Sequence, residues 1–212
     1  MANSNSPFGL LQIGLNGSPV TNGAMEERRN GILSTNNTAF YTGDLIKAVA
    51  GGYLEQWSAG TAVSQLWGVF QGCRYASAAQ QTILLNKYWP GSGNAVAGTV
   101  LAQYIPAILS PPPLFVIQTD STGITVADIG ANADVNVGTG STTSGKSGMY
   151  LDVGTLATTA TLPLRIVDLW ANRAMGGFPE QAGGSSSLVP GTQAGAYNWA
   201  VVVLNVTLTT GI

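Results

Sequence analysis

Apolar residues occur along the chain in short runs that are separated by clusters of Gly, Asn, Ser and Thr. Runs of this kind indicate β strands joined by tight turns, whereas an amphipathic helix needs apolar residues three and four positions apart over a longer stretch. Residues 77–81 and 122–129 are compatible with one helical turn each. The predicted strands comprise residues 10–15, 27–34, 44–49, 52–55, 66–72, 81–87, 97–104, 114–118, 133–137, 148–153, 162–169 and 200–209. We therefore predict an all-β protein with an antiparallel β-barrel or sandwich-like core.

Composition divides the chain into three parts. Residues 1–21 contain few core-sized side chains and indicate an N-terminal arm, residues 22–173 hold most predicted strands and indicate the β core domain, and residues 174–212 begin as a Gly/Ser-rich linker. A strongly apolar strand follows this linker. This strand could pair outside the local core, either with the N-terminal arm or with another subunit. It could equally be the last strand of the chain's own sheet, and the sequence does not distinguish the two arrangements. Arms that contact a neighbouring protein would place these anchors at the interface: Phe8, Leu11, Ile13, Trp199 and Val201.

The chain carries unusually little charge. It has 8 Lys+Arg and 10 Asp+Glu, so 8% of its residues are charged, against roughly 25% in an average soluble protein. A surface built from small polar residues indicates area that neighbouring molecules cover, although a small β protein with a neutral surface is the plainer interpretation. The adjoining Arg28 and Arg29 follow Glu26 and Glu27, so no concentrated basic footprint exists. We expect no nucleic-acid partner.

Targeting and redox signals are equally sparse. Residues 1–15 lack the basic and apolar regions of a signal peptide, and no run of about 18 apolar residues occurs, so we expect no secretion signal and no membrane partner. Cys73 is the single cysteine, which excludes an internal disulfide and fits folding in a reducing cytoplasm. A chain without histidine offers no base to activate this thiol, so a small buried side chain is the expected role.

One motif matches a catalytic pattern. Residues 140–147, GSTTSGKS, satisfy the phosphate-loop pattern through Gly140, Gly145, Lys146 and Ser147. A phosphate loop needs a fully apolar strand before it and a helix after it. Here an alternating strand precedes the motif, two glycines and β-branched residues follow it, and the alternating strand and helix pattern of nucleotide hydrolases is absent. We therefore interpret the match as incidental and predict no cofactor.

Other catalytic chemistry lacks its residues. Without histidine and with one cysteine, zinc and iron sites have almost no ligands, and a serine triad has no base. Asp120, Asp128, Asp134 and Asp152 lie in one region, where paired carboxylates could serve a glycosidase. Each has Gly, Ser, Thr or Asn within two positions, and near such residues aspartate ordinarily forms turns and caps. We therefore predict that the protein is not an enzyme and holds no metal.

Five segments carry a resemblance to a known family: LWGVFQGCRY at 66–75, KYWPG at 87–91, LFVIQ at 114–118, ADIGANAD at 127–134 and ATLPLRIV at 160–167. Together they resemble a family of small structural proteins of tailed bacteriophages and prophages, typically encoded near the major capsid protein. The resemblance spans about two-thirds of the chain and includes no catalytic signature. It implies a capsid decoration, or cement, protein that is made in the host bacterial cytoplasm and resides on the capsid surface of the virion. The implied partners are the major capsid protein and further copies of the chain in a homotrimer.

A second function is open from the sequence. A carbohydrate- or host-binding β module on the virion surface would use exposed tryptophans as stacking platforms. The candidates are Trp57, Trp67, Trp89, Trp170 and Trp199. Packing in the core is the plainer role for most of them, and their exposure in the folded chain discriminates between the two.

Overall fold

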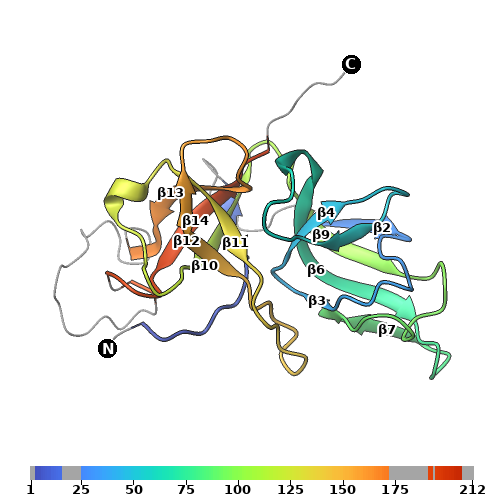
Figure 1. Cartoon of the computed structure of the whole chain (residues 1–212). Helices are drawn as coiled ribbons and strands as arrows, with labels where there is room; N and C mark the ends of the chain where they lie inside the picture. Colours follow the sequence, from blue (N-terminus) through green and yellow to red (C-terminus); the bar gives the residue numbers. More distant parts are fainter. Residues whose placement is uncertain (1–2, 16–24, 172–190, 193, 207–212) are drawn as a thin grey trace, which may run out of the picture.

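The computed structural model describes residues 3–15, 25–171, 191–192 and 194–206, and within them β strands account for nearly all regular structure (Figure 1). Two short 3-10 helices, η1 (Val63–Gln65) and η2 (Val126–Asp128), join strands. Much of the linker predicted after residue 173 lies outside the described residues. The strands are β1 (Leu11–Leu15), β2 (Glu26–Arg29), β3 (Phe40–Tyr41), β4 (Leu45–Ala48), β5 (Leu54–Gln56), β6 (Leu66–Ala76), β7 (Ile83–Asn86), β8 (Tyr88–Trp89), β9 (Leu101–Pro106), β10 (Pro113–Gln118), β11 (Asn132–Asn136), β12 (Tyr150–Ala157), β13 (Leu164–Leu169) and β14 (Trp199–Leu204).

The first sheet contains six antiparallel strands in the order β1-β10-β14-β13-β11-β12. Strand β10 is buried along its whole length, which explains its continuous apolar sequence, because both of its faces are covered. An isolated bridge between Thr119, just beyond β10, and Leu151 of β12 shows that the sheet curls back on itself.

The second sheet is also antiparallel, in the order β2-β9-β6-β4-β5, and β7 pairs with the far end of β6. Strand β6 approaches β9 so closely at Gly68 that a Cβ there would lie 2.1 Å from the Ile105 carbonyl oxygen. Only glycine fits this contact. A two-stranded sheet of β3 and β8 lies beside the second sheet.

Two apolar cores hold the sheets together. The larger core lies where the two six-stranded sheets meet, and it combines Phe115 and Val202 of the first sheet with Leu45 and Val69 of the second. The smaller core includes Phe70 of the second sheet together with residues such as Phe40, Trp89 and Ile32. The fold is therefore all-β and sandwich-like, with antiparallel sheets packed against each other.

Both predicted arms differ from the structure where it describes them. Strand β1 of the N-terminal region pairs with β10, and β14 lies between β10 and β13 inside the first sheet. Of the two possibilities left open for the C-terminal strand, closure of its own sheet is the one observed. The reason is physical: without β14, the apolar strands β10 and β13 would each expose an unpaired edge.

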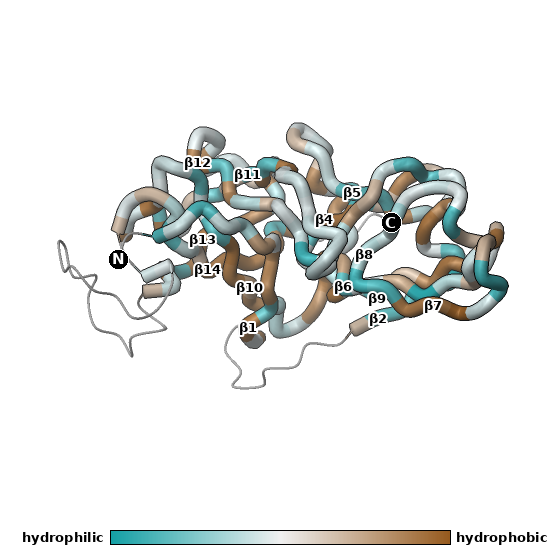
Figure 2. The backbone as a smooth tube through the Cα atoms, turned by 90° about the horizontal axis from the view of Figure 1, so that it is seen from below, coloured by the Kyte–Doolittle hydropathy of each residue, from teal (hydrophilic) through white to brown (hydrophobic). Residues whose placement is uncertain are grey.

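Strand positions were predicted well by local pattern. Every predicted strand overlaps an observed one, and η2 lies within the predicted helical turn at 122–129. The two-residue strands β3 and β8 were missed because so short a pairing has no periodicity of its own. Figure 2 shows hydrophobic residues along β10 and hydrophilic ones on β2, in keeping with the interior and edge positions of these strands.

Candidate functional site

The loop that matches the phosphate-loop pattern joins β11 to β12. It closes on itself, because the N–H of Ser141 donates to the carbonyl of Lys146 at 2.9 Å and the N–H of Gly145 donates to the carbonyl of Ser141 at 2.7 Å. The chain then enters β12 at Tyr150 instead of a helix. This loop therefore lacks the row of free helix N–H groups that holds a phosphate.

Ser147 has a structural partner. Its hydroxyl donates a hydrogen bond to the carboxylate of Asp44 on the second sheet's side and accepts one of 2.8 Å from the N–H of Met149. The side chain is buried, with 2% of its surface exposed, whereas the neighbouring Lys146 is exposed. The hydroxyl that would contact a nucleotide-bound cation is thus already engaged in joining the two sheets.

Asp44 is a buried carboxylate with three donors. Besides the Ser147 hydroxyl, the N–H of Tyr41 and the Nε2 of Gln56 each donate to it at 2.8 Å. Burial raises the pKa of Asp44 above its ordinary value, and the hydrogen bonds from Ser147, Tyr41 and Gln56 act in the opposite direction. Only 1% of the Asp44 surface is exposed, and the three hydrogen bonds offset the cost of removing its carboxylate from water.

The N-terminal segment crosses the same junction. The N–H of Gly9 donates to the carbonyl of Met149 at 3.1 Å, and the N–H of Leu10 donates to the carbonyl of Gly43 at 2.8 Å. We call this meeting point the clasp; it joins the N-terminal segment, the β3–β4 turn and the chain entering β12. The clasp comprises Gly9, Gly43, Asp44, Ser147 and Met149.

A second polar contact ties the sheets together. The indole N–H of Trp57 donates to the Asp134 carboxylate at 3.0 Å, and the N–H of Gly60 donates to its other oxygen at 3.0 Å. Both side chains are buried. The two residues are 77 positions apart in the chain, so no local pattern could have paired them.

The other aspartates of the region also bind donors of the chain itself. Asp120 accepts from the N–H groups of Thr122 and Val153, Asp128 accepts from Thr125 in a capping box, and Asp152 accepts from the N–H of Gly154. The bonds of Asp128 and Asp152, and the bond of Asp120 to Thr122, are the turn and cap role expected from the sequence. The Asp120–Val153 bond and the bonds of Asp134 to Trp57 and Gly60 instead join distant segments, so for these contacts the expectation was wrong. Burial raises the pKa of Cys73 to about 12, which keeps this thiol neutral near pH 7.

We predict opposite results for two neighbouring substitutions in the loop. Ser147→Ala should lower the free energy of unfolding by about 1–3 kcal/mol, because it leaves Asp44 short of a donor and Met149 N–H without its acceptor. Lys146→Ala should change it by less than about 0.5 kcal/mol. Urea titration measures both free energies of unfolding.

Calorimetry of the wild-type chain with ATP or GTP and Mg²⁺ should show no binding. Saturable sub-millimolar binding that is lost in the Lys146→Ala variant would contradict our interpretation of the loop.

The structure brings several of the predicted interface residues to one face of the first sheet. Leu11, Val116 and Val201 lie directly opposite one another across β1, β10 and β14, and directly opposed residues share a face. At one end of this face Phe8 packs edge-on against Trp199, with ring centroids 4.8 Å apart.

These residues differ sharply in accessibility. Val201 has 0% of its surface exposed, so it is not available to a partner, and its predicted interface role was wrong. Phe8 and Trp199 are half-buried against each other, and Ile13 is half-buried on the edge strand β1. Leu11 remains a candidate, because 57% of its surface is exposed.

Two further exposed apolar sites were missed by sequence reasoning. Ile83 and Leu85 on β7 are 64% and 73% exposed, and Val126 and Ile129 at η2 are 58% and 38% exposed. The apolar run of β7 predicts a strand correctly but carries no sign of which face is covered. The exposed residues at η2 look like ordinary core residues in the sequence.

The tryptophans pack mostly inside the protein. Trp57 and Trp89 are buried, and Trp170 and Trp199 are half-buried with ring centroids 6.1 Å apart. Trp67 is 38% exposed, but the guanidinium of Arg28 lies 4.8 Å from its ring centroid. This distribution does not form the exposed row of rings that the carbohydrate-binding alternative requires.

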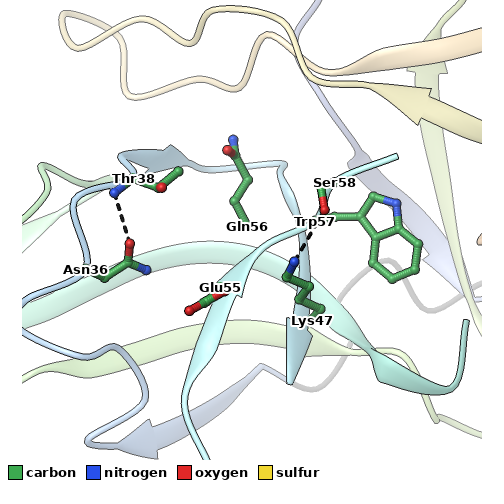
Figure 3. Close-up of a pocket in the computed structure, with 7 residues that line it drawn as sticks. All are labelled: Asn36, Thr38, Lys47, Glu55, Gln56, Trp57 and Ser58. Atoms are coloured by element: carbon green, nitrogen blue, oxygen red, sulfur yellow. Dashed lines mark hydrogen bonds between the residues drawn. The ribbon is translucent and has the colours of Figure 1, made fainter. Parts of the chain in front are cut away.

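A small polar pocket of about 240 Å³ lies at β4 and β5. Figure 3 shows the Nζ of Lys47 turned toward the Ser58 hydroxyl, to which it donates at 3.3 Å, while the Trp57 ring lies apart from the other side chains drawn. The pocket's polar groups are thus partly paired with each other, and it offers no stacking surface. Its lining consists of Asn36, Thr38, Lys47, Glu55, Gln56, Trp57 and Ser58.

The described residues show neither a metal centre nor a membrane-spanning helix. In the part of the chain that the structure describes, no cluster of three or more Cys, Asp or Glu residues could hold a metal ion. None of the described helices has the length and hydrophobicity that a membrane crossing needs. No protein-family model matches the chain, and no curated protein or solved structure matches it either.

Proposed function

We propose that this chain is a capsid decoration protein of a tailed bacteriophage, which binds the expanded lattice of the major capsid protein from outside and stabilises it. The proposal begins from the resemblance of residues 66–75 and four further segments to small phage structural proteins. It includes manufacture in the host cytoplasm, residence on the virion and assembly as a homotrimer. An all-β chain with its polar groups engaged in structural bonds suits such a mechanical role.

The observation that carries the proposal is the character of the surface. The chain has 18 ionic side chains in 212 residues, from 8 Lys+Arg and 10 Asp+Glu, and large aliphatic side chains are exposed at well-separated places. Single exposed apolar residues are common on soluble proteins. A weakly charged surface on which exposed apolar residues occur in pairs, however, favours binding to other protein molecules. Such a surface suits a protein that works covered by neighbours. The exposed residues include Leu11, Met25, Ile83, Leu85, Ile108 and Val126.

The mechanism follows from mass action. A protein that binds the expanded lattice and not its precursor stabilises the expanded state by its binding free energy. Many copies on one shell add up without strong single contacts. Because few ionic side chains are available, binding should depend on apolar and small polar contacts, and added salt should weaken it very little.

The test compares particles with and without the protein. Particles that lack it should assemble but release DNA at lower temperature or under osmotic shock, measured by fluorescence of a DNA-binding dye during heating. Adding the purified chain back should restore the release temperature, and should do so at both low and high salt. Equal heat stability of depleted and complete particles would overturn the proposal.

A further inference from the structure

One end of the molecule carries an exposed apolar strand edge. Strand β7 pairs with β6 on one side, and no described strand pairs with its other edge. Ile83 and Leu85, two positions apart and therefore on one face, are 64% and 73% exposed. The exposed Arg74 of β6 lies directly opposite Leu85. We call Ile83, Leu85 and Arg74 the β7 patch.

The opposite edge of the same sheet is constructed differently. Strand β2 consists of Glu26, Glu27, Arg28 and Arg29, and charged side chains on an edge strand oppose pairing with another chain. Figure 2 shows this contrast as hydrophilic residues on β2 and hydrophobic residues on β7. The sheet is thus protected at β2 and unprotected at β7, which points to a partner at β7.

The other end of the molecule carries a matching apolar projection. At η2, Val126 and Ile129 are 58% and 38% exposed. Local hydrogen bonds stabilise the turn: the Asp128 carboxylate accepts from the N–H and hydroxyl of Thr125 at 2.7 and 2.9 Å. The N–H of Gly130 donates to the β13 carbonyl of Ile166 at 2.9 Å. We call Val126, Asp128 and Ile129 the η2 patch.

We propose that the β7 patch of one copy binds the η2 patch of a second copy, head to tail. Each patch presents two aliphatic side chains beside one charge, and the charges are opposite: Arg74 at β7 and Asp128 at η2. The exposed Lys87 just beyond β7 adds to the positive side. In this contact the Arg74 guanidinium of one copy would face the Asp128 carboxylate of the next, beside the apolar side chains. A contact between two β7 patches would instead bring two positive charges together, so the pairing of β7 with η2 is favoured.

The positions of the patches exclude a contact within one chain. In Figure 1, β7 lies at the lower right and η2, the coiled turn at the left, lies at the far end of the other sheet. A contact between two different patches repeats from copy to copy, so it closes into a ring or continues as a filament. The inference rests on the proposed function only in its expectation that the ring closes at three copies.

The test is complementation between two variants. Leu85→Asp places a carboxylate in the β7 patch, where it would face Asp128, and Val126→Gln replaces an aliphatic anchor of the η2 patch by a neutral polar side chain. Both sites are exposed enough to leave the fold intact. Each alone should weaken self-association about 30-fold or more, the loss typical of an interface anchor. Mixed in equal amounts they should form a one-to-one dimer, because one intact β7 patch and one intact η2 patch remain. Sedimentation velocity measures all three samples, and circular dichroism confirms that the variants are folded.

The control and the contrary outcomes are distinct. Ile108→Asp changes a residue that is 56% exposed and belongs to neither patch, so it should associate as the wild type does. Undiminished association of the Val126 variant would show that β7 pairs with itself, and a wild-type chain that stays monomeric at high concentration would also overturn the inference. Capsid binding by the wild-type chain is measured separately on depleted particles, so failure of the proposed function is not confused with failure of this contact.

Discussion

Replacing Leu10 with alanine should lower the free energy of unfolding by about 2–5 kcal/mol, the usual loss for a truncated core leucine. Leu10 is 2% exposed and belongs to the larger core, and its N–H is bonded to Gly43 of the clasp. The adjacent Leu11 points outward and is 57% exposed. Leu11→Ala should therefore change stability by less than about 0.5 kcal/mol.

Together, Leu10→Ala and Leu11→Ala distinguish between two interpretations of the N-terminal segment. A segment laid on another protein would tolerate both substitutions in the isolated chain, whereas a strand of the chain's own sheet tolerates only the second. Guanidinium titration followed by tryptophan fluorescence measures both free energies. Equal, small effects at Leu10 and Leu11 would mean that residues before β2 are dispensable for folding.

Replacing Gly9 with alanine should be comparably damaging, at about 2–4 kcal/mol. Gly9 has a φ of +73°, and an added Cβ would lie 2.5 Å from the Cβ of Ser147 and 2.6 Å from the carbonyl oxygen of Gly43. The unfavourable φ costs about 1 kcal/mol or more, and overlap with packed atoms adds about 1–3 kcal/mol. The backbone of the clasp would have to separate to admit the methyl group.

Gly60 supplies the matched control. Its φ is +77°, nearly the same as that of Gly9, but an added Cβ would meet nothing within 4 Å. Gly60→Ala should therefore show the cost of φ alone. Thermal unfolding of the two variants in parallel gives the difference, and similar midpoints would show that the clasp is not closed as described.

The match to a phosphate loop shows how a motif depends on its surroundings. All eight residues from 140 to 147 satisfy the phosphate-loop pattern. The residues that follow nevertheless form a strand, and the Ser147 hydroxyl is hydrogen-bonded to the Asp44 carboxylate. The sequence already indicated that no helix follows. That the serine joins two sheets could not be predicted, because Asp44 lies 103 residues earlier in the chain.

The positions of the strands follow from local sequence, because alternation and turn residues act over a few positions. The sequence predicted β10 and β13 closely, and it was compatible with a helical turn at residues 122–129, where η2 lies. It also indicated that the chain carries few charges for its size, a property of composition alone.

Which strands pair and which of their faces are covered became clear from the folded chain alone. The apolar sequence of β14 is compatible with pairing to another protein as well as with its observed place between β10 and β13. The apolar sequence of β7 is typical of a core strand, although Ile83 and Leu85 face solvent. Strand formation is encoded locally, whereas pairing and burial depend on residues far apart in the chain. Trp57 and Asp134 meet only after both sheets have formed, so their bond is a result of the fold and not of any pattern along the sequence.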